Sequence, residues 1–182
     1  MPDGTWRIEF EFILFYAILN SQGEIIMDNA LTEKVLIVYY SNSGTAEKIA
    51  LHIKKLLPEA DVDRLGYKDR NYKRHTMFSA LFKVPVTPKA IDGAAHKPSD
   101  YGRLILIFPI WAGAPAPVMR AYLKNNKAVF NEKQYNMVCV SGGGDDRVAK
   151  WLKDHGITAP AEKLNLKQKL VESDDYNLTS II

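Results

Sequence analysis

The segment that most constrains the fold is KVLIVYYSNSGTAEKIA, residues 34–50. It begins with a continuous apolar run rich in β-branched residues, which is typical of a strand buried on both faces. A short polar stretch follows at once, and apolar residues then recur with helical spacing until Pro58. A buried strand that leads directly into an amphipathic helix predicts a parallel sheet covered by helices.

Two later apolar runs repeat this arrangement. GRLILIFPIW predicts a strand over residues 103–110, and PAPVMRAYLKNN predicts a helix with prolines in its first turn, where the missing N–H costs little. YNMVCVS predicts a strand over residues 135–141, followed by a helix that ends at Gly156. DVDRL and EKLNL predict shorter strands. The alternation of strands and helices predicts an α/β fold with a doubly wound parallel sheet.

Residues 1–33 form an extension ahead of a domain that we predict over residues 34–182. WRIEFEFILFYAIL alternates polar and apolar residues and then becomes wholly apolar, in a run too short to span a bilayer. Its two glutamates do not suit the basic leader of a signal peptide. We expect a strand or hairpin with NSQG as the turn. The alternatives are an extension upstream of a start near Met27, or a membrane or partner contact, with a homodimer as one way to cover the aromatic residues.

Composition narrows the function classes. At 182 residues with 47% hydrophobic residues, the chain is long enough for one domain with a real core. The net charge is +3, and the scattered lysines favour solvated faces over a nucleic-acid surface. The single cysteine, Cys139, excludes an internal disulfide, fits a cytoplasmic location, and lies in an apolar run that favours a buried thiol. The four histidines lack ligand spacing, so we expect no metal site.

Residues 66–100 are basic, weakly patterned and contain prolines, with one possible helix near residues 77–82. A loop this long in a compact domain is usually functional or mobile. Its basic group over residues 70–75 would either contact the phosphates of a second nucleotide or form a solvated surface, and the latter is the more ordinary use of such charges.

Ligands of open parallel sheets bind outside the carboxyl ends of the strands. The first such end reads Ser-Asn-Ser-Gly-Thr, over residues 41–45. A helix N-terminus there offers unpaired N–H groups and a partial positive charge, and the hydroxyls add further donors. These features suit a phosphate monoester, yet the same residue types are ordinary helix caps, and the loop alone is more typical of capping. It is neither a P-loop nor a GxGxxG dinucleotide motif.

The other two strand ends favour a ligand with a flat ring. Trp111 follows Pro109 directly after a strand, and an indole at that place is suited to stacking on an aromatic ligand. The alternative is a tryptophan packed over the next helix. The third end carries glycines at 142–144, which let the backbone approach a ring edge closely, unless they form only a flexible linker.

At these motifs the chain resembles the flavodoxin family. The family's phosphate loop, Ser/Thr-x-Ser/Thr-Gly-x-Ser/Thr, is similar to SNSGTA, and its second loop, Gly-x-Pro-x-Trp-x-Gly-x-x-x-Pro, is similar to FPIWAG and the prolines behind it. SGGG is similar to the family's segment at the pyrimidine side of the flavin. The resemblance covers roughly residues 34–166.

The resemblance implies a flavodoxin-like sandwich whose five-stranded parallel sheet has the order 2-1-3-4-5 and which binds FMN noncovalently. The residues that it implies at the phosphate are Ser41, Asn42, Ser43, Gly44, Thr45 and Ala46. At one face of the ring it implies Pro109, Ile110, Trp111 and Gly113, and at the ring edge Ser141, Gly142, Gly143, Gly144 and Asp145. No acid or base from the protein is required. For Asp145 and Asp146, capping of the following helix is a more ordinary function than catalysis.

Departures from the family pattern bear on function. Ala46 replaces the last hydroxyl of the phosphate loop, the third loop lacks the tyrosine that many carrier flavodoxins place over the ring, and the chain is basic where such carriers are acidic. These differences favour an FMN-dependent oxidoreductase of the NAD(P)H- or quinone-reductase type. The alternatives are a non-enzymatic electron-transfer flavodoxin and a flavodoxin-fold scaffold that has lost FMN.

Overall fold

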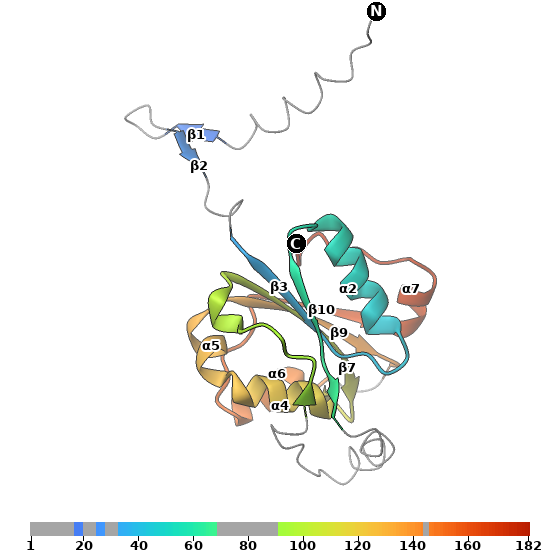
Figure 1. Ribbon diagram of the computed structural model, residues 1–182. Coiled ribbons are helices and arrows are strands. Elements are labelled where there is room, and N and C mark those ends of the chain that lie inside the picture. The colour runs from blue at the N-terminus through green and yellow to red at the C-terminus, as the bar shows by residue number, and fades with distance from the viewer. Residues whose placement is uncertain (1–16, 20–24, 28–32, 69–90, 144–145) are drawn as a thin grey trace, which may run out of the picture. The chain divides into compact units, whose positions relative to one another are not determined.

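The computed structural model describes residues 17–19, 25–27, 33–68, 91–143 and 146–182 (Figure 1). Contacts between residues divide the chain into two compact units, Met1–Glu33 and Lys34–Ile182. In the first unit, β1 (Ala17–Leu19) pairs antiparallel with β2 (Ile25–Met27). The turn predicted at NSQG and the alternating residues before β1 lie outside the described residues.

The second unit contains a parallel sheet of five strands. In chain order they are β3 (Val35–Tyr39), β4 (Asp61–Arg64), β7 (Arg103–Trp111), β9 (Tyr135–Ser141) and β10 (Glu162–Lys167). Their spatial order is β4-β3-β7-β9-β10, which confirms the predicted order 2-1-3-4-5. Because all five strands run the same way, their carboxyl ends meet at one edge of the sheet, where the predicted loops follow β3, β7 and β9.

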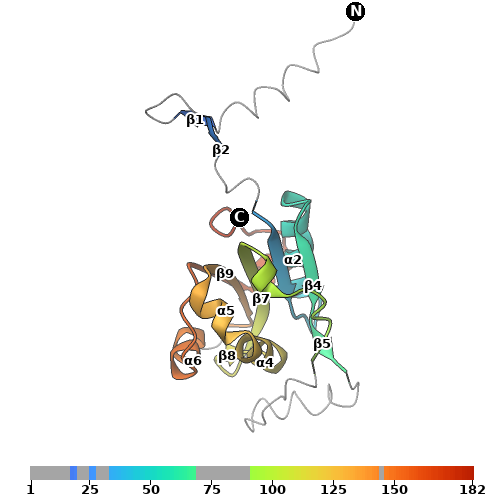
Figure 2. The ribbon, with the colours of Figure 1, turned by 60° about the vertical axis from the view of Figure 1, so that its left-hand side comes forward.

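Helices cover both faces of the sheet (Figures 1 and 2). One face carries α2 (Thr45–Leu56) and α7 (Gln168–Glu172), and the other carries α4 (Pro117–Asn125), α5 (Lys127–Glu132) and α6 (Val148–Asp154). Alternate residues of β3 enter the two cores: Ile37 joins the cluster under α2, and Leu36 joins the cluster under α4. Burial on both faces explains why the central strands are continuous apolar runs.

Several short elements lie outside the sequence predictions. β8 (Ala114–Pro115) pairs antiparallel with β7, and β5 (Gly66–Tyr67) pairs antiparallel with β6 (Ile91–Asp92). A 3-10 turn, η3 (Pro98–Asp100), precedes β7. The helix predicted near residues 77–82 and the basic group over residues 70–75 fall outside the part of the chain that the structure describes.

Candidate functional site

The loop between β3 and α2 is closed by its own hydroxyl groups. The backbone N–H of Gly44 donates to Ser41 Oγ at 3.0 Å, and the hydroxyls of Ser43 and Thr45 lie 3.1 Å apart. Gly44 has φ of +93°, while a Cβ built on it would meet no atom within 4 Å. The glycine is therefore required for its left-handed backbone rather than for space.

The first turn of α2 has no side-chain cap. Gly44 occupies the N-cap position, and no side chain accepts a hydrogen bond from the start of the helix. The first intrahelical bond runs from Lys48 N–H to Gly44 O at 2.9 Å, so the N–H groups of the three residues between them have no partner within the helix. The alternative of ordinary capping and turn formation therefore holds for Gly44, which is the N-cap, and for Ser41, which accepts its N–H, whereas no hydroxyl caps the first turn of α2. The helix end keeps donors available for an anion.

The second loop is a tight turn from β7 into β8. Trp111 lies opposite Ala114, and both residues between them have positive φ, +50° for Ala112 and +81° for Gly113. Two consecutive left-handed residues match the type I′ turn of a two-residue hairpin. Because a non-glycine residue rarely adopts this conformation, Ala112 marks a site of backbone strain.

Arg120 of α4 forms hydrogen bonds to the backbone of this turn. Its Nε donates to Pro115 O at 2.5 Å and its Nη2 donates to Trp111 O at 3.3 Å. Burial lowers the pKa of the guanidinium from its usual value. Arg147 also contacts the turn, because its backbone N–H donates to Gly113 O at 2.8 Å. These bonds fix the backbone that carries Trp111.

Trp111 is half-buried and belongs to a row of aromatic rings. Its ring meets Tyr40 edge-on, with centroids 5.9 Å apart and an interplanar angle of 79°, and Tyr40 meets Tyr67 in the same way at 6.0 Å and 82°. Burial raises the pKa of Tyr40, which stays protonated within the core. Packing against Tyr40 holds the indole while leaving part of it accessible at the strand end.

The third loop begins at Ser141 and has exposed glycines at 142 and 143. Gly144 and Asp145 lie outside the described residues. The loop returns to the fold through Asp146, whose Oδ1 accepts the backbone N–H of Val148 at 3.0 Å and whose Oδ2 is paired with Lys163 of β10. Asp146 therefore holds the start of α6, as the sequence suggested for this aspartate.

The three loops meet in one cavity of about 250 Å³. Ten of the predicted site residues line it: Ser41, Asn42, Ser43, Thr45, Ala46, Pro109, Ile110, Trp111, Ser141 and Gly142. Gly44, Gly113 and Gly143 shape the loops without lining the cavity. Among the described lining residues there is no lysine, arginine or histidine, so donors in the cavity are hydroxyls, amides and backbone N–H groups.

Two lining residues, Val140 and Gln168, were not predicted from the sequence. Val140 is the last apolar residue of the β9 run, which reads as core. Gln168 follows the last strand directly, opposite the third loop, since Lys167 is paired with Ser141. The rule that ligands lie at the carboxyl ends of strands could have been extended to this end of β10.

Other candidate chemistry is absent from the described residues. Cys139 is fully buried, which confirms its prediction as a core thiol, and burial raises its pKa to about 12. No group of three or more metal-ligating side chains occurs in the described ranges. Within the same ranges, no helix has the length and apolar character needed to cross a membrane.

Comparisons with known proteins bear on the fold. No family model matches the sequence, and no curated protein matches it. A flavoprotein in complex with FMN from Lactobacillus acidophilus NCFM matches the structure with a TM-score of 0.60 and 17% identity, over 78% of this chain and 97% of that chain. A protein from Bacteroides eggerthii DSM 20697, solved as a candidate flavoprotein, matches with a TM-score of 0.58 and 18% identity, over 82% and 98%.

At these identities the likeness concerns the fold. Both solved structures are covered almost in full, and the strand order is the one that the sequence motifs implied. The predicted flavodoxin-like fold is therefore confirmed. A shared fold does not fix function, which depends on the residues of the cavity itself.

Proposed function

We propose that the protein binds FMN noncovalently in the cavity at the carboxyl ends of β3, β7 and β9. The observation that carries the proposal is that one cavity joins the uncapped start of α2, the half-buried Trp111 and the glycine loop after Ser141. A phosphate tail and a flat heterocycle on one ligand match these three features together. The flavoprotein from Lactobacillus acidophilus NCFM, which has the same fold, was solved in complex with FMN and supports this choice of ligand.

The phosphate would lie at the start of α2. The N–H groups of the first helical turn and the hydroxyls of Ser41, Ser43 and Thr45 supply the donors, and the helix end contributes partial positive charge. Asn42 would add an amide from the exposed side of the loop. Gly44 supplies the left-handed backbone on which the loop closes.

The isoalloxazine ring would lie along the second and third loops. Pro109, Ile110 and Trp111 form an apolar wall for one face, and Ser141 and the glycine backbone after it are suited to the polar ring edge. Because the cavity is smaller than the usual range for ligand sites, which begins at about 300 Å³, the ring would extend past it across the indole. When bound, FMN supplies hydride and one-electron chemistry, and the protein supplies position and exclusion of water.

The FMN would serve an oxidoreductase that acts on a small acceptor of the quinone type, with NAD(P)H as the reductant. Two observations support an enzyme over an electron carrier. The third loop contains no aromatic residue to cover the second face of the ring, and the net charge of +3 does not suit docking to basic redox partners. An open ring face leaves room for a substrate.

The binding proposal is tested by titrating FMN into the purified protein and following flavin fluorescence, with riboflavin as the ligand that lacks the phosphate. We expect FMN to bind at micromolar concentration or tighter and riboflavin to bind more weakly. The absence of FMN binding at high micromolar concentration would refute the proposal and favour the scaffold alternative.

The enzyme proposal is tested by anaerobic stopped-flow mixing of the FMN-loaded protein with NADH or NADPH. Bleaching of the flavin absorbance by either reductant is the expected result, followed by reoxidation on addition of a soluble quinone. If neither reductant bleaches the bound flavin, the electron-carrier alternative replaces the enzyme.

A further inference from the structure

Gln168 lines the proposed FMN cavity from the C-terminal part of the chain. It is the first residue of α7, directly after Lys167, whose β-partner is Ser141 of the third loop. It lines the same cavity as Ala46, the residue that stands where the phosphate loop of the family has its last hydroxyl. The cavity thus combines a missing donor on α2 with an added amide on α7.

The side-chain amide of Gln168 carries one N–H group more than its bond to Glu172 requires. Its Nε2 donates to Glu172 Oε1 at 2.7 Å, one turn further along α7. A primary amide nitrogen carries two N–H groups, so the second remains available to a ligand while the first orients the side chain. Val171 is fully buried and packs in the same core cluster as Ala46, which fixes α7 against α2.

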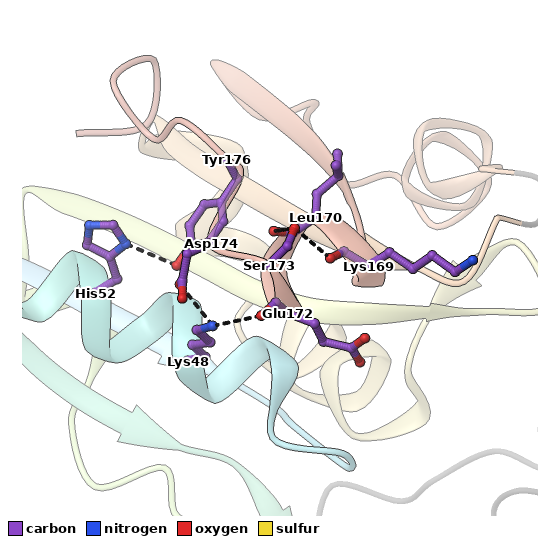
Figure 3. Close-up of polar contacts among 8 residues, drawn as sticks. All are labelled: Lys48, His52, Lys169, Leu170, Glu172, Ser173, Asp174 and Tyr176. Carbon is purple, nitrogen blue, oxygen red and sulfur yellow. Dashed lines mark hydrogen bonds and ion pairs between the residues drawn. The ribbon is translucent and has the colours of Figure 1, made fainter.

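A set of polar contacts, here called the C-terminal latch, ties the segment after α7 to α2 (Figure 3). Lys48 Nζ pairs with Asp174 Oδ1 at 2.8 Å and lies 3.5 Å from Glu172 O. One helical turn further on, His52 Nδ1 lies 3.0 Å from Tyr176 Oη, and the two rings meet edge-on. Both contacts lie on the same face of α2, because Lys48 and His52 are four residues apart.

The backbone after α7 places Asp174 in position for the C-terminal latch. The Ser173 hydroxyl donates to Lys169 O at 3.0 Å, which ends the helix, and Asp174 then adopts φ of +57° (Figure 3). This left-handed residue turns the chain so that its carboxylate faces Lys48. Lys48, the first cationic residue in the sequence of α2, is thereby paired with the C-terminal segment, while an uncharged amide lines the cavity.

We propose that Gln168 is a phosphate-binding residue of the FMN site, which supplies the donor that Ala46 lacks, and that the C-terminal latch holds it in place. This inference rests on the proposed binding of FMN. It assigns part of the cofactor site to a segment beyond the motifs of the three loops. The group that Gln168 recognises is the phosphate ester of the flavin mononucleotide, not the ring.

The test compares FMN with riboflavin in the full chain. Gln168→Ala should lower FMN affinity about 10-fold, because a hydrogen bond to a charged group is lost, and should change riboflavin affinity by less than about twofold. Glu172→Gln is the matched control: it keeps Gln168 and an acceptor for its amide, so FMN affinity should stay within about twofold of the parent.

A double variant tests whether Gln168 replaces the donor that Ala46 lacks. Adding Ala46→Ser to Gln168→Ala returns a hydroxyl to the phosphate loop and should restore FMN affinity to within about threefold of the parent. Failure of this rescue, an unchanged FMN affinity in Gln168→Ala, or an equal loss for FMN and riboflavin would each overturn the inference. A loss in Glu172→Gln as large as in Gln168→Ala would also overturn it, since helix stability would then explain both.

The latch is tested with Asp174→Asn, because asparagine tolerates the left-handed conformation and removes only the charge. We expect up to about threefold weaker FMN binding in the parent background, since exposed ion pairs are weak, and no further loss in the Gln168→Ala background. Additive losses in the two backgrounds would show that the latch does not act through Gln168. A parent that binds no FMN would instead remove the proposed function, and with it this inference.

Discussion

Two loop residues beside the cavity have a left-handed backbone, which is strained for the non-glycine Ala112, and neither of the two lines the cavity. Ala112 and Gly44 both adopt positive φ, and each lies where a strand end becomes a ligand-facing turn. Strain of this kind persists only where the surrounding structure fixes it, here by Arg120 and Arg147 around the second loop.

Trp111→Ala should weaken FMN binding about 10-fold, since stacking and apolar contact with the ring are lost. Trp111→Phe keeps an aromatic wall and the contact with Tyr40, and should lose less than about threefold. Flavin fluorescence titration of both variants measures the difference. Equal affinities for the parent and Trp111→Ala would contradict a ring laid against the indole.

Gly44→Ala should lower the free energy of unfolding by about 1–2 kcal/mol, because alanine pays for the left-handed backbone although its Cβ meets no atom. Gly142→Ala is the control, as a Cβ there also meets open space and no positive φ is required. Its unfolding free energy should change by less than about 0.5 kcal/mol. Urea denaturation that finds the two variants equal would refute the backbone argument.

At the scale of elements, one contact joins β4 to the segment that follows β6. His96 contacts both carboxylate oxygens of Asp63. Its backbone N–H donates to Oδ2 at 3.1 Å, and its Nδ1 lies 2.7 Å from Oδ1. Asp63 is buried in the strand, and this hydrogen bond raises the pKa of His96 above its usual value. These two contacts tie the segment to β4, the edge strand of the sheet.

This contact predicts a pH dependence of stability. Because the pKa of His96 is raised in the folded state, its contribution is fully present below the unfolded value of about 6.5 and is lost as the pH rises through the folded pKa. The gap in unfolding free energy between the parent and His96→Gln should therefore be largest near pH 6 and should shrink toward pH 9. A gap that stays constant over this range would exclude the charged pair.

Elements were predictable where burial leaves a pattern. The runs of β7 and β9 are apolar over most of their length because both faces are covered, and α2 shows its core face at helical spacing. α5 was missed since Phe130 is its only buried residue, which is too little for a periodic signal. The β7–β8 hairpin was missed as a type I′ turn because Ala112 stands where glycine or asparagine is expected.

The residues of the candidate site were predictable where they belong to a motif that directly follows a strand. Loop residues at the ends of β3, β7 and β9 could be read from a pattern because each follows its strand directly. Arg120 could not, since it reaches the second loop only after folding brings distant segments together. Gln168 shows no motif either, and only the general rule on strand carboxyl ends, applied to β10, could have indicated it. A glutamine and an arginine in helical segments carry no mark of such a position.

For the whole molecule, all described cavity residues and both core clusters belong to the unit Lys34–Ile182. The isolated segment 34–182 should therefore unfold cooperatively and bind FMN with an affinity within about twofold of the full chain. Calorimetric unfolding with and without FMN measures both properties, because a ligand that binds only the folded state raises the melting temperature. Loss of FMN binding in this segment would assign residues 1–33 a part in the site.

The central claim is that three strand ends hold one FMN, and backbone amide NMR of the full chain during FMN titration tests it most directly. The predicted result is that the signals of Thr45, Ala46, Trp111 and Gly142 shift together and saturate at one FMN per chain, while the amide of His96, on a separate part of the fold, is unchanged. Saturation with FMN that leaves the amides of Thr45 and Trp111 unmoved would contradict it.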